Sequence, residues 1–175
     1  MAPAAPMHPT PPTAPSPLAY NLYIYDRAGK CLHYQEWHRP KSVRQGAGTQ
    51  ADDQKQMFGL FWTLSNFCAT LNPKDPAKSQ LGQLRSVGDG CGFSAFTAST
   101  YKMHFLETPS GVKFVLNTAR DVGSCRALLQ SLYDDVFVGV GVRSPFYVPG
   151  EGVSCDQFDG AVAALLAQRG LLPAV

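Results

Sequence analysis

A few side chains in this 175-residue chain are of the types that perform chemistry. Cys31 and His33 stand two positions apart in a segment that we expect to be a strand, where they would share one face and could bind a metal. Structural zinc sites need a second pair of ligands at a similar spacing, and the sequence offers none. Packing and a hydrogen bond explain both residues better, so we expect no metal and no other cofactor.

Four further side chains are candidates for catalysis. Cys91 lies in the glycine-rich stretch Gly88–Gly92, which could expose its thiol, but no basic partner that would activate it is identifiable. His104 alternates onto a strand face as a structural residue would, and nothing pairs Glu36 with Glu107 for acid–base work. The chain also contains no P-loop and no nucleophile-elbow motif. We therefore predict a protein without catalytic activity, and a small thiol-dependent enzyme using Cys91 is kept as an alternative.

The composition indicates a globular protein of a reducing compartment. Hydrophobic residues make up 45% of the chain, and the net charge of +2 is too small to indicate a nucleic-acid partner. The five cysteines form no metal-binding pattern and their number is odd, which favours free thiols and a cytoplasmic location. No signal peptide and no apolar run of about 20 residues occurs, so any contact with a membrane should be peripheral.

Proline and glycine divide the chain into segments. Residues 1–18 contain seven prolines and no charge, so we predict a disordered tail. Residues 19–175 should form a single domain, interrupted by an extended loop at about 72–90.

The apolar pattern predicts an α/β (α+β) fold in the order ββ-α-βββ-α-α. Strands are expected at 20–25, 31–37, 92–99, 101–107 and 112–116. The helices should begin near Asp52, Ser124 and Ser154, where Ser154–Gln157 matches a capping box, and the last two should end at Gly139 or Gly141 and at Gly170. Because residues 20–25 are apolar at almost every position, the five-stranded, mainly antiparallel sheet should carry one helix on one face and two on the other.

The first predicted helix has more apolar surface than one sheet can cover. A stripe at helical spacing consists of Met57, Leu60, Phe61, Leu64, Phe67, Cys68 and Leu71. Phe58 and Trp62 form a second apolar face. We therefore nominate Phe58, Trp62 and Phe61 as residues of a subunit interface, and the alternative is that the 72–90 loop covers them.

Three segments resemble the small, longin-like subunits of the TRAPP tethering complex, the family of sedlin and synbindin, and subunit 1 in particular. They are Asn21–Arg27, Cys31–Arg39 and Tyr101–Thr118, and the resemblance extends over about 19–170. It implies a longin (SNARE-like) fold and a core subunit of an obligate hetero-oligomer at endoplasmic reticulum and cis-Golgi membranes. It also implies that the assembled complex is a guanine-nucleotide exchange factor for the Rab GTPase of endoplasmic-reticulum-to-Golgi transport.

An exchange factor acts by binding the nucleotide-free GTPase better than the loaded one, which requires surfaces and no nucleophile. The GTPase-facing candidates are Asp26, Arg27 and Arg39, and solvated charges are the alternative reading. A longin-type small chain of a vesicle coat adaptor, or a SNARE regulatory domain, is a second possibility for the whole chain. A SNARE would continue into a heptad coiled coil and a membrane anchor, which the sequence up to Val175 does not contain.

Overall fold

The computed structural model describes residues 17–39, 49–71, 94–145, 147–153 and 155–173. The predictions for the proline-rich tail, for the 72–90 loop and for Cys91 concern residues outside these ranges, apart from the last two residues of the tail.

The predicted five-stranded sheet is confirmed. Its strands are β1 (Ala19–Tyr25), β2 (Cys31–Glu36), β3 (Ala95–Thr97), β4 (Lys102–Glu107) and β5 (Lys113–Thr118). They lie in the order β2-β1-β5-β4-β3, and every neighbouring pair is antiparallel. Within the described residues β3 is much shorter than the strand expected at 92–99. Two of the three interior strands, β1 and β5, are buried along most or all of their length, as expected for strands that are covered on both faces.

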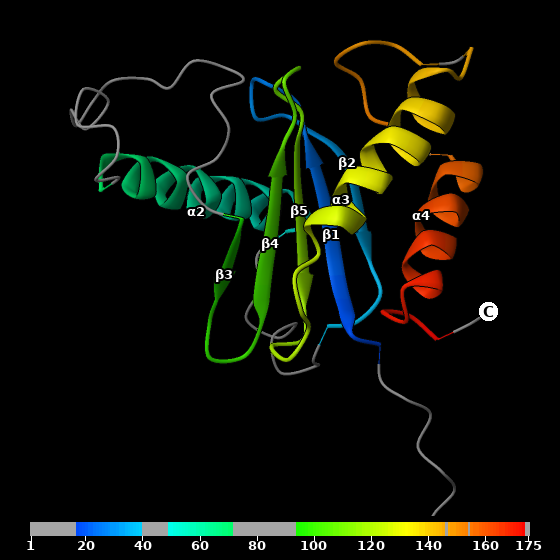
Figure 1. The fold of residues 1–175 in the computed structure, drawn as a ribbon. Coiled ribbons are helices and arrows are strands. Elements are labelled where there is room, and N and C mark those ends of the chain that lie inside the picture. Colours follow the sequence, from blue (N-terminus) through cyan, green and yellow to red (C-terminus); the bar gives the residue numbers. More distant parts are fainter. Residues whose placement is uncertain (1–16, 40–48, 72–93, 146, 154, 174–175) are drawn as a thin grey trace, which may run out of the picture.

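Helices cover both faces of the sheet, as predicted (Figure 1). The helix α2 (Gln50–Thr70) crosses one face. The other face carries α3 (Arg126–Ser131), its continuation η2 (Leu132–Val142), and α4 (Asp156–Gln168). In Figure 1, α2 runs behind the strands and its C-terminal end reaches beyond β3.

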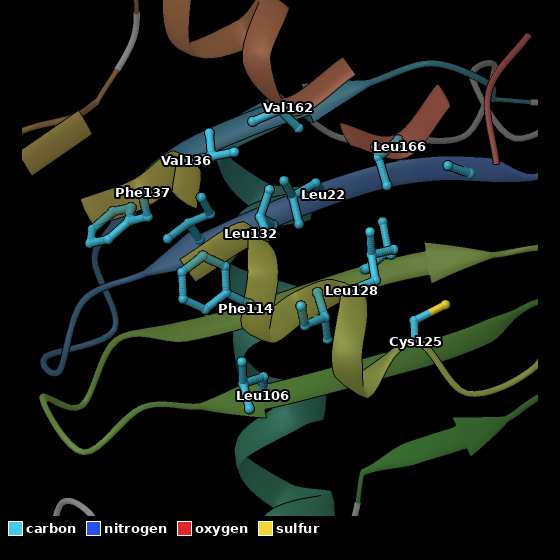
Figure 2. Packing of buried hydrophobic residues seen from close by; sticks show 14 of the residues in the cluster. Leu22, Leu106, Phe114, Cys125, Leu128, Leu132, Val136, Phe137, Val162 and Leu166 are labelled. Carbon is cyan, nitrogen blue, oxygen red and sulfur yellow. The ribbon is translucent and has the colours of Figure 1, made fainter. Parts of the chain in front are cut away.

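Each face of the sheet has its own core. Figure 2 shows the larger one, in which Leu22 and Phe114 of the sheet meet Leu132, Phe137 and α4. The smaller core lies under α2 and consists of Tyr23, Tyr25, Phe61, Met103, Phe105 and Val115.

A bulge in β2 corrects the expectation that Cys31 and His33 share a face. Tyr25 pairs with Cys31, but its neighbour Ile24 pairs with His33, so Leu32 is the extra residue of the bulge. Cys31 therefore packs against the core under α2, whereas His33 lies against Phe158 of α4, with ring centroids 4.8 Å apart. The two residues are on opposite sides of the sheet and cannot bind one metal ion together.

The helices on the second face differ from the prediction in detail. The helix predicted from Ser124 begins at Arg126 with Cys125 as its N-cap, and from Leu132 onward it has π-helical hydrogen bonding. A π-helix of this length is rare, and no simple sequence signal predicts it. It continues to Val142, one residue beyond the predicted end at Gly141. Gly141 packs against α4, where an added Cβ would lie 3.2 Å from the Phe158 ring.

The ends of α4 give one correction and one confirmation. Cys155 occupies its N-cap, without a side-chain hydrogen bond, so the helix does not begin with the predicted Ser154 cap; Ser154 itself lies outside the described residues. Gly170 has φ +71°, a conformation that suits a glycine just after a helix, and it confirms the predicted end.

Candidate interaction surface on α2 and the β1–β2 hairpin

The sheet-facing side of α2 is centred on Phe61. This ring stacks on Phe105 of β4 with centroids 4.0 Å apart and is only 1% exposed. Ser65, one turn further along, is also buried. Phe61 thus attaches α2 to the sheet, and its side chain offers almost no surface to a partner. It can contribute to the nominated interface only by holding α2 in position.

Phe58 lies at the edge of the same contact. Its ring packs against Tyr25, with centroids 5.3 Å apart, and against the β1–β2 turn at Gly29. Trp62 stacks on the outer side of Phe58, with centroids 6.3 Å apart, and remains 40% exposed. Of the three nominated residues, Trp62 is therefore the one with a large apolar surface open to a partner.

The opposite flank of α2 exposes a second apolar strip that the sequence interpretation assigned to the sheet. Leu60, Phe67 and Leu71 are spaced by seven and four residues, which places them on one side of a helix. Phe67 and Leu71 are 60% and 62% exposed, and the C-terminal end of α2 that carries them extends beyond β3, the last described strand on that side of the sheet (Figure 1). On β3, Phe96 pairs with Met103 and so faces the α2 side, where it too is exposed.

The β1–β2 turn carries two of the GTPase-facing candidates. The Asp26 carboxylate accepts a hydrogen bond from the Lys30 backbone N–H at 2.8 Å and so shapes the turn, while Arg27 is exposed. Beneath the turn, the buried Lys113 ammonium donates to the Gly111 carbonyl at 3.0 Å and lies 3.5 Å from the Asp26 and Arg27 carbonyls. Burial lowers the pKa of Lys113, and the nearby Glu107 carboxylate, 3.8 Å away, opposes that shift.

Arg39 lies at the other end of the hairpin. A strand of six residues spans about 20 Å, so the structure separates Arg39 from Asp26 and Arg27 by roughly that distance. Its guanidinium is 2.5 Å from the Asp53 carboxylate and 3.3 Å from that of Glu36. These ion pairs join the end of β2 to the start of α2. The three candidates therefore do not form one site, and Arg39 has a structural role in the described fold.

The titratable side chains that the structure describes are held by packing and backbone contacts. The His33 Nδ1 is 2.9 Å from the Val153 carbonyl, and burial lowers the pKa of His33. The His104 Nε2 is 3.1 Å from the Thr118 hydroxyl, and burial lowers the pKa of His104 to about 4. Burial also raises the pKa of the Cys31 thiol to about 11, which makes it unreactive. Within the described residues no group of three His, Cys, Asp or Glu side chains could hold a metal ion.

Comparison with known proteins gives the family. The model of the sybindin-like family matches residues 19–169. The chain belongs to the sybindin-like family. The five-stranded sheet between helices agrees with the longin-type fold expected for it. In the described part of this sybindin-like protein, no helix combines the length and apolar character needed to span a bilayer.

Several relatives of this sybindin-like protein have names that refer to one assembly. "Trafficking protein particle complex subunit 1" of Dictyostelium discoideum is 31% identical over 151 residues, which cover 86% of this chain and 96% of that protein. The human protein of the same name is 35% identical over 139 residues, 79% of this chain and 85% of its own. "Transport protein particle subunit bet5" of Schizosaccharomyces pombe is 26% identical over 154 residues, 79% of this chain and 89% of its own.

Two features of the sybindin-like surface were missed by reasoning from the sequence. Lys113 begins β5, in which the next three residues are apolar. A single lysine beside such a run could have predicted a buried ammonium group that contacts a neighbouring loop. The sequence did not predict that Leu60, Phe67 and Leu71 are exposed. Their exposure depends on how far α2 extends relative to the sheet.

Proposed function

We propose that this sybindin-like chain is a non-catalytic core subunit of the TRAPP complex. We also propose that it contributes to the guanine-nucleotide exchange activity of that complex toward a Rab GTPase in transport from the endoplasmic reticulum to the Golgi apparatus. The observation that carries the proposal is the similarity over at least 79% of the chain to proteins named as subunits of a trafficking particle.

The exposed side chains of α2 support a role as a subunit. Trp62 projects from one flank of the helix, and Phe67 and Leu71 project from the other. Burial of apolar surface contributes about 25 cal/mol per Å², and aromatic side chains are frequent anchors of protein interfaces. Neighbouring subunits that cover α2 would therefore gain a large part of their binding free energy from this helix.

The β1–β2 turn is the part of the described surface that we assign to the GTPase. Arg27 is exposed there, and Lys113 fixes the carbonyl groups of Asp26 and Arg27 from below. An exchange factor has to present a preformed surface to the nucleotide-free GTPase. A turn held by a buried cation meets that requirement, whereas Arg39 acts indirectly by fixing α2 to the hairpin.

The proposed location follows from the proposed partners. The protein would be cytoplasmic and would associate peripherally with endoplasmic reticulum and cis-Golgi membranes through its complex. Residues 19–175 would act as one longin-like unit, with the proline-rich segment 1–18 preceding it.

Affinity purification of the tagged full-length chain from its own cells tests the proposal. Mass spectrometry should identify other TRAPP subunits as the dominant associated proteins, and removal of the chain from the reconstituted complex should reduce the rate of GDP release from the Rab. Recovery of vesicle-coat adaptor large chains in place of TRAPP subunits would contradict the proposal and favour the adaptor class.

A further inference from the structure

A hollow of about 660 Å³ lies beside the N-terminal half of α2. Its aromatic residues include Tyr20 of β1, Tyr101 just before β4, and His38 shortly after β2, whose ring centroid lies 5.7 Å from that of Tyr20. Met57 and Leu60 of α2 add apolar side chains. Binding sites in proteins have volumes of this order. None of the roles discussed above uses this hollow.

The hollow lies at the end of the sheet where the N-terminal tail is attached. Because neighbouring strands are antiparallel, the start of β1, the end of β2, the start of β4 and the end of β5 meet at one end of the sheet, and residues at or next to all four line the hollow. The structure describes the chain from Pro17, three residues before Tyr20. Three residues span at most about 11 Å, so residues 1–16 are attached within that distance of a lining residue.

The prolines of the tail follow a regular spacing. Every third position from 3 to 15 is a proline, namely Pro3, Pro6, Pro9, Pro12 and Pro15. A polyproline II helix has three residues per turn, so prolines at this spacing lie along one edge of it. Such a helix has no internal hydrogen bonds and is held in one place only by contacts with a surface. Aromatic-lined grooves are surfaces that bind proline-rich segments in this conformation.

The charges of the hollow and of the tail also agree. Arg39 and Asp53 line the hollow, form an ion pair at 2.5 Å and neutralise each other. Residues 1–16 contain no Asp, Glu, Lys or Arg. The segment 40–48, which follows Arg39 directly, contains two basic residues, and a buried charge without a partner is costly. The tail is therefore better suited to the hollow than this segment.

Exposed polar side chains of the lining can bind the backbone of the tail. A proline-rich segment has a carbonyl group at every residue but few N–H groups, so a surface that binds it has to supply hydrogen-bond donors. Gln56 and Thr100 are exposed lining residues that carry an amide and a hydroxyl group. Tyr20 and Tyr101 are half-buried, so part of each ring remains open to proline.

We propose that the hollow binds the N-terminal tail of the same chain, with the period-three prolines of residues 1–16 packed as a polyproline II segment on Tyr20 and Tyr101. The covalent attachment keeps the tail at an effective concentration of about 1 mM, so a weak intrinsic affinity is sufficient. Docking would also shield Leu60, which lines the hollow and belongs to the exposed apolar strip of α2. The inference does not depend on the proposed role as a subunit of a complex.

Nuclear Overhauser contacts in the full-length chain, labelled with 13C at its methionine methyl groups, test the inference. Met57 lines the hollow, and Met103, fully buried in the core, serves as the internal reference. We expect contacts between the Met57 methyl group and proline ring protons of residues 1–16, and no such contacts from Met103. Absence of these contacts at Met57 in the unaltered chain would overturn the inference without any variant.

Two full-length variants, each lacking two prolines, test whether the spacing matters. Pro9→Ala with Pro12→Ala interrupts the period-three series, and it should remove most of the Met57 contacts and shift the Met57 signal while that of Met103 stays unchanged. Pro11→Ala with Pro17→Ala is the matched control, because neither residue belongs to the series, and it should preserve the contacts. Equal effects of the two variants would overturn the proposed mode of binding.

The same signal distinguishes the tail from other occupants. In a mixture of labelled and unlabelled chains, contacts between the labelled Met57 methyl group and an unlabelled tail would assign the hollow to a second copy and overturn the proposal. Contacts from residues 40–48 in place of the tail would overturn it as well. A Met57 signal that lacks tail contacts in the free chain and shifts only in the purified complex would assign the hollow to a partner polypeptide, which also contradicts the proposal.

Discussion

Phe58 of α2 lies so close to Gly29 in the β1–β2 turn that a Cβ atom on Gly29 would be 2.6 Å from the ring carbon Cζ. Gly29 also has φ +91°, which side chains other than glycine rarely adopt. The turn and the helix therefore fit together only because this position has no side chain, and Phe58, nominated from the sequence as an interface residue, holds the hairpin to α2.

Gly29→Ala should lower the free energy of unfolding by about 2–3 kcal/mol, since it adds a steric conflict with Phe58 to the cost of positive φ. Gly150→Ala is the matched control, because Gly150 has φ +82° but open space around its would-be Cβ. It should cost about 1 kcal/mol. Urea unfolding of both variants measures the difference, and equal losses would show that Phe58 does not constrain the turn.

Phe61→Ala and Phe67→Ala test which side of α2 faces the sheet. Phe61 stacks on Phe105 in the core, so its loss should cost about 3–4 kcal/mol of stability. Phe67 is largely exposed, and its replacement should change stability by about 0.5 kcal/mol or less. Thermal unfolding of the two variants gives the comparison, and a larger loss for Phe67 would mean that α2 is rotated relative to the structure described.

Stability should fall as the solution becomes acidic. The pKa of His104 is about 4 in the folded protein and about 6.5 when unfolded, so between these values the unfolded chain takes up a proton that the folded chain does not. The free energy of unfolding should therefore decrease from pH 6.5 to pH 4, by up to about 3 kcal/mol for this residue, with His33 acting in the same direction. His104→Gln should flatten this dependence in urea unfolding, and an unchanged slope would exclude His104 as its source.

Lys113→Met should reduce nucleotide exchange by the assembled complex several-fold without loss of assembly. The variant keeps the apolar stem and removes the ammonium that contacts the Asp26 and Arg27 carbonyls, so the turn loses its support. Arg27→Ala should have the same effect on exchange with no effect on stability, because Arg27 is exposed. GDP release from the Rab is the readout, and unchanged rates for both variants would remove the turn from the GTPase surface.

The layered fold was predictable because the strand sequences contain its main signal. Residues 20–25 are apolar on both faces, which requires helices on both sides of the sheet, and Gly170 ends the last helix as expected. The bulge at Leu32 was not predictable, since it depends on how β2 pairs with β1. One extra residue there was enough to place Cys31 and His33 on opposite faces.

The candidate surface was predictable only in part. The apolar residues of α2 surround most of the helix, so spacing alone could not decide that Phe61 and Ser65 face the sheet while Phe67 faces solvent. The separation of Arg39 from Arg27 and its pairing with Asp53 depend on the tertiary structure.

The central claim is that α2 is covered by a neighbouring subunit, and recovery of partners with a Trp62→Glu variant tests it most directly. Val142→Glu is the matched control, because Val142 is an apolar residue of similar exposure, 38% against 40%, on the opposite face of the sheet. A charge buried at an interface without a partner strongly opposes binding. Trp62→Glu should reduce the co-purified TRAPP subunits at least tenfold while Val142→Glu leaves them unchanged. Full recovery of partners with Trp62→Glu would contradict the account.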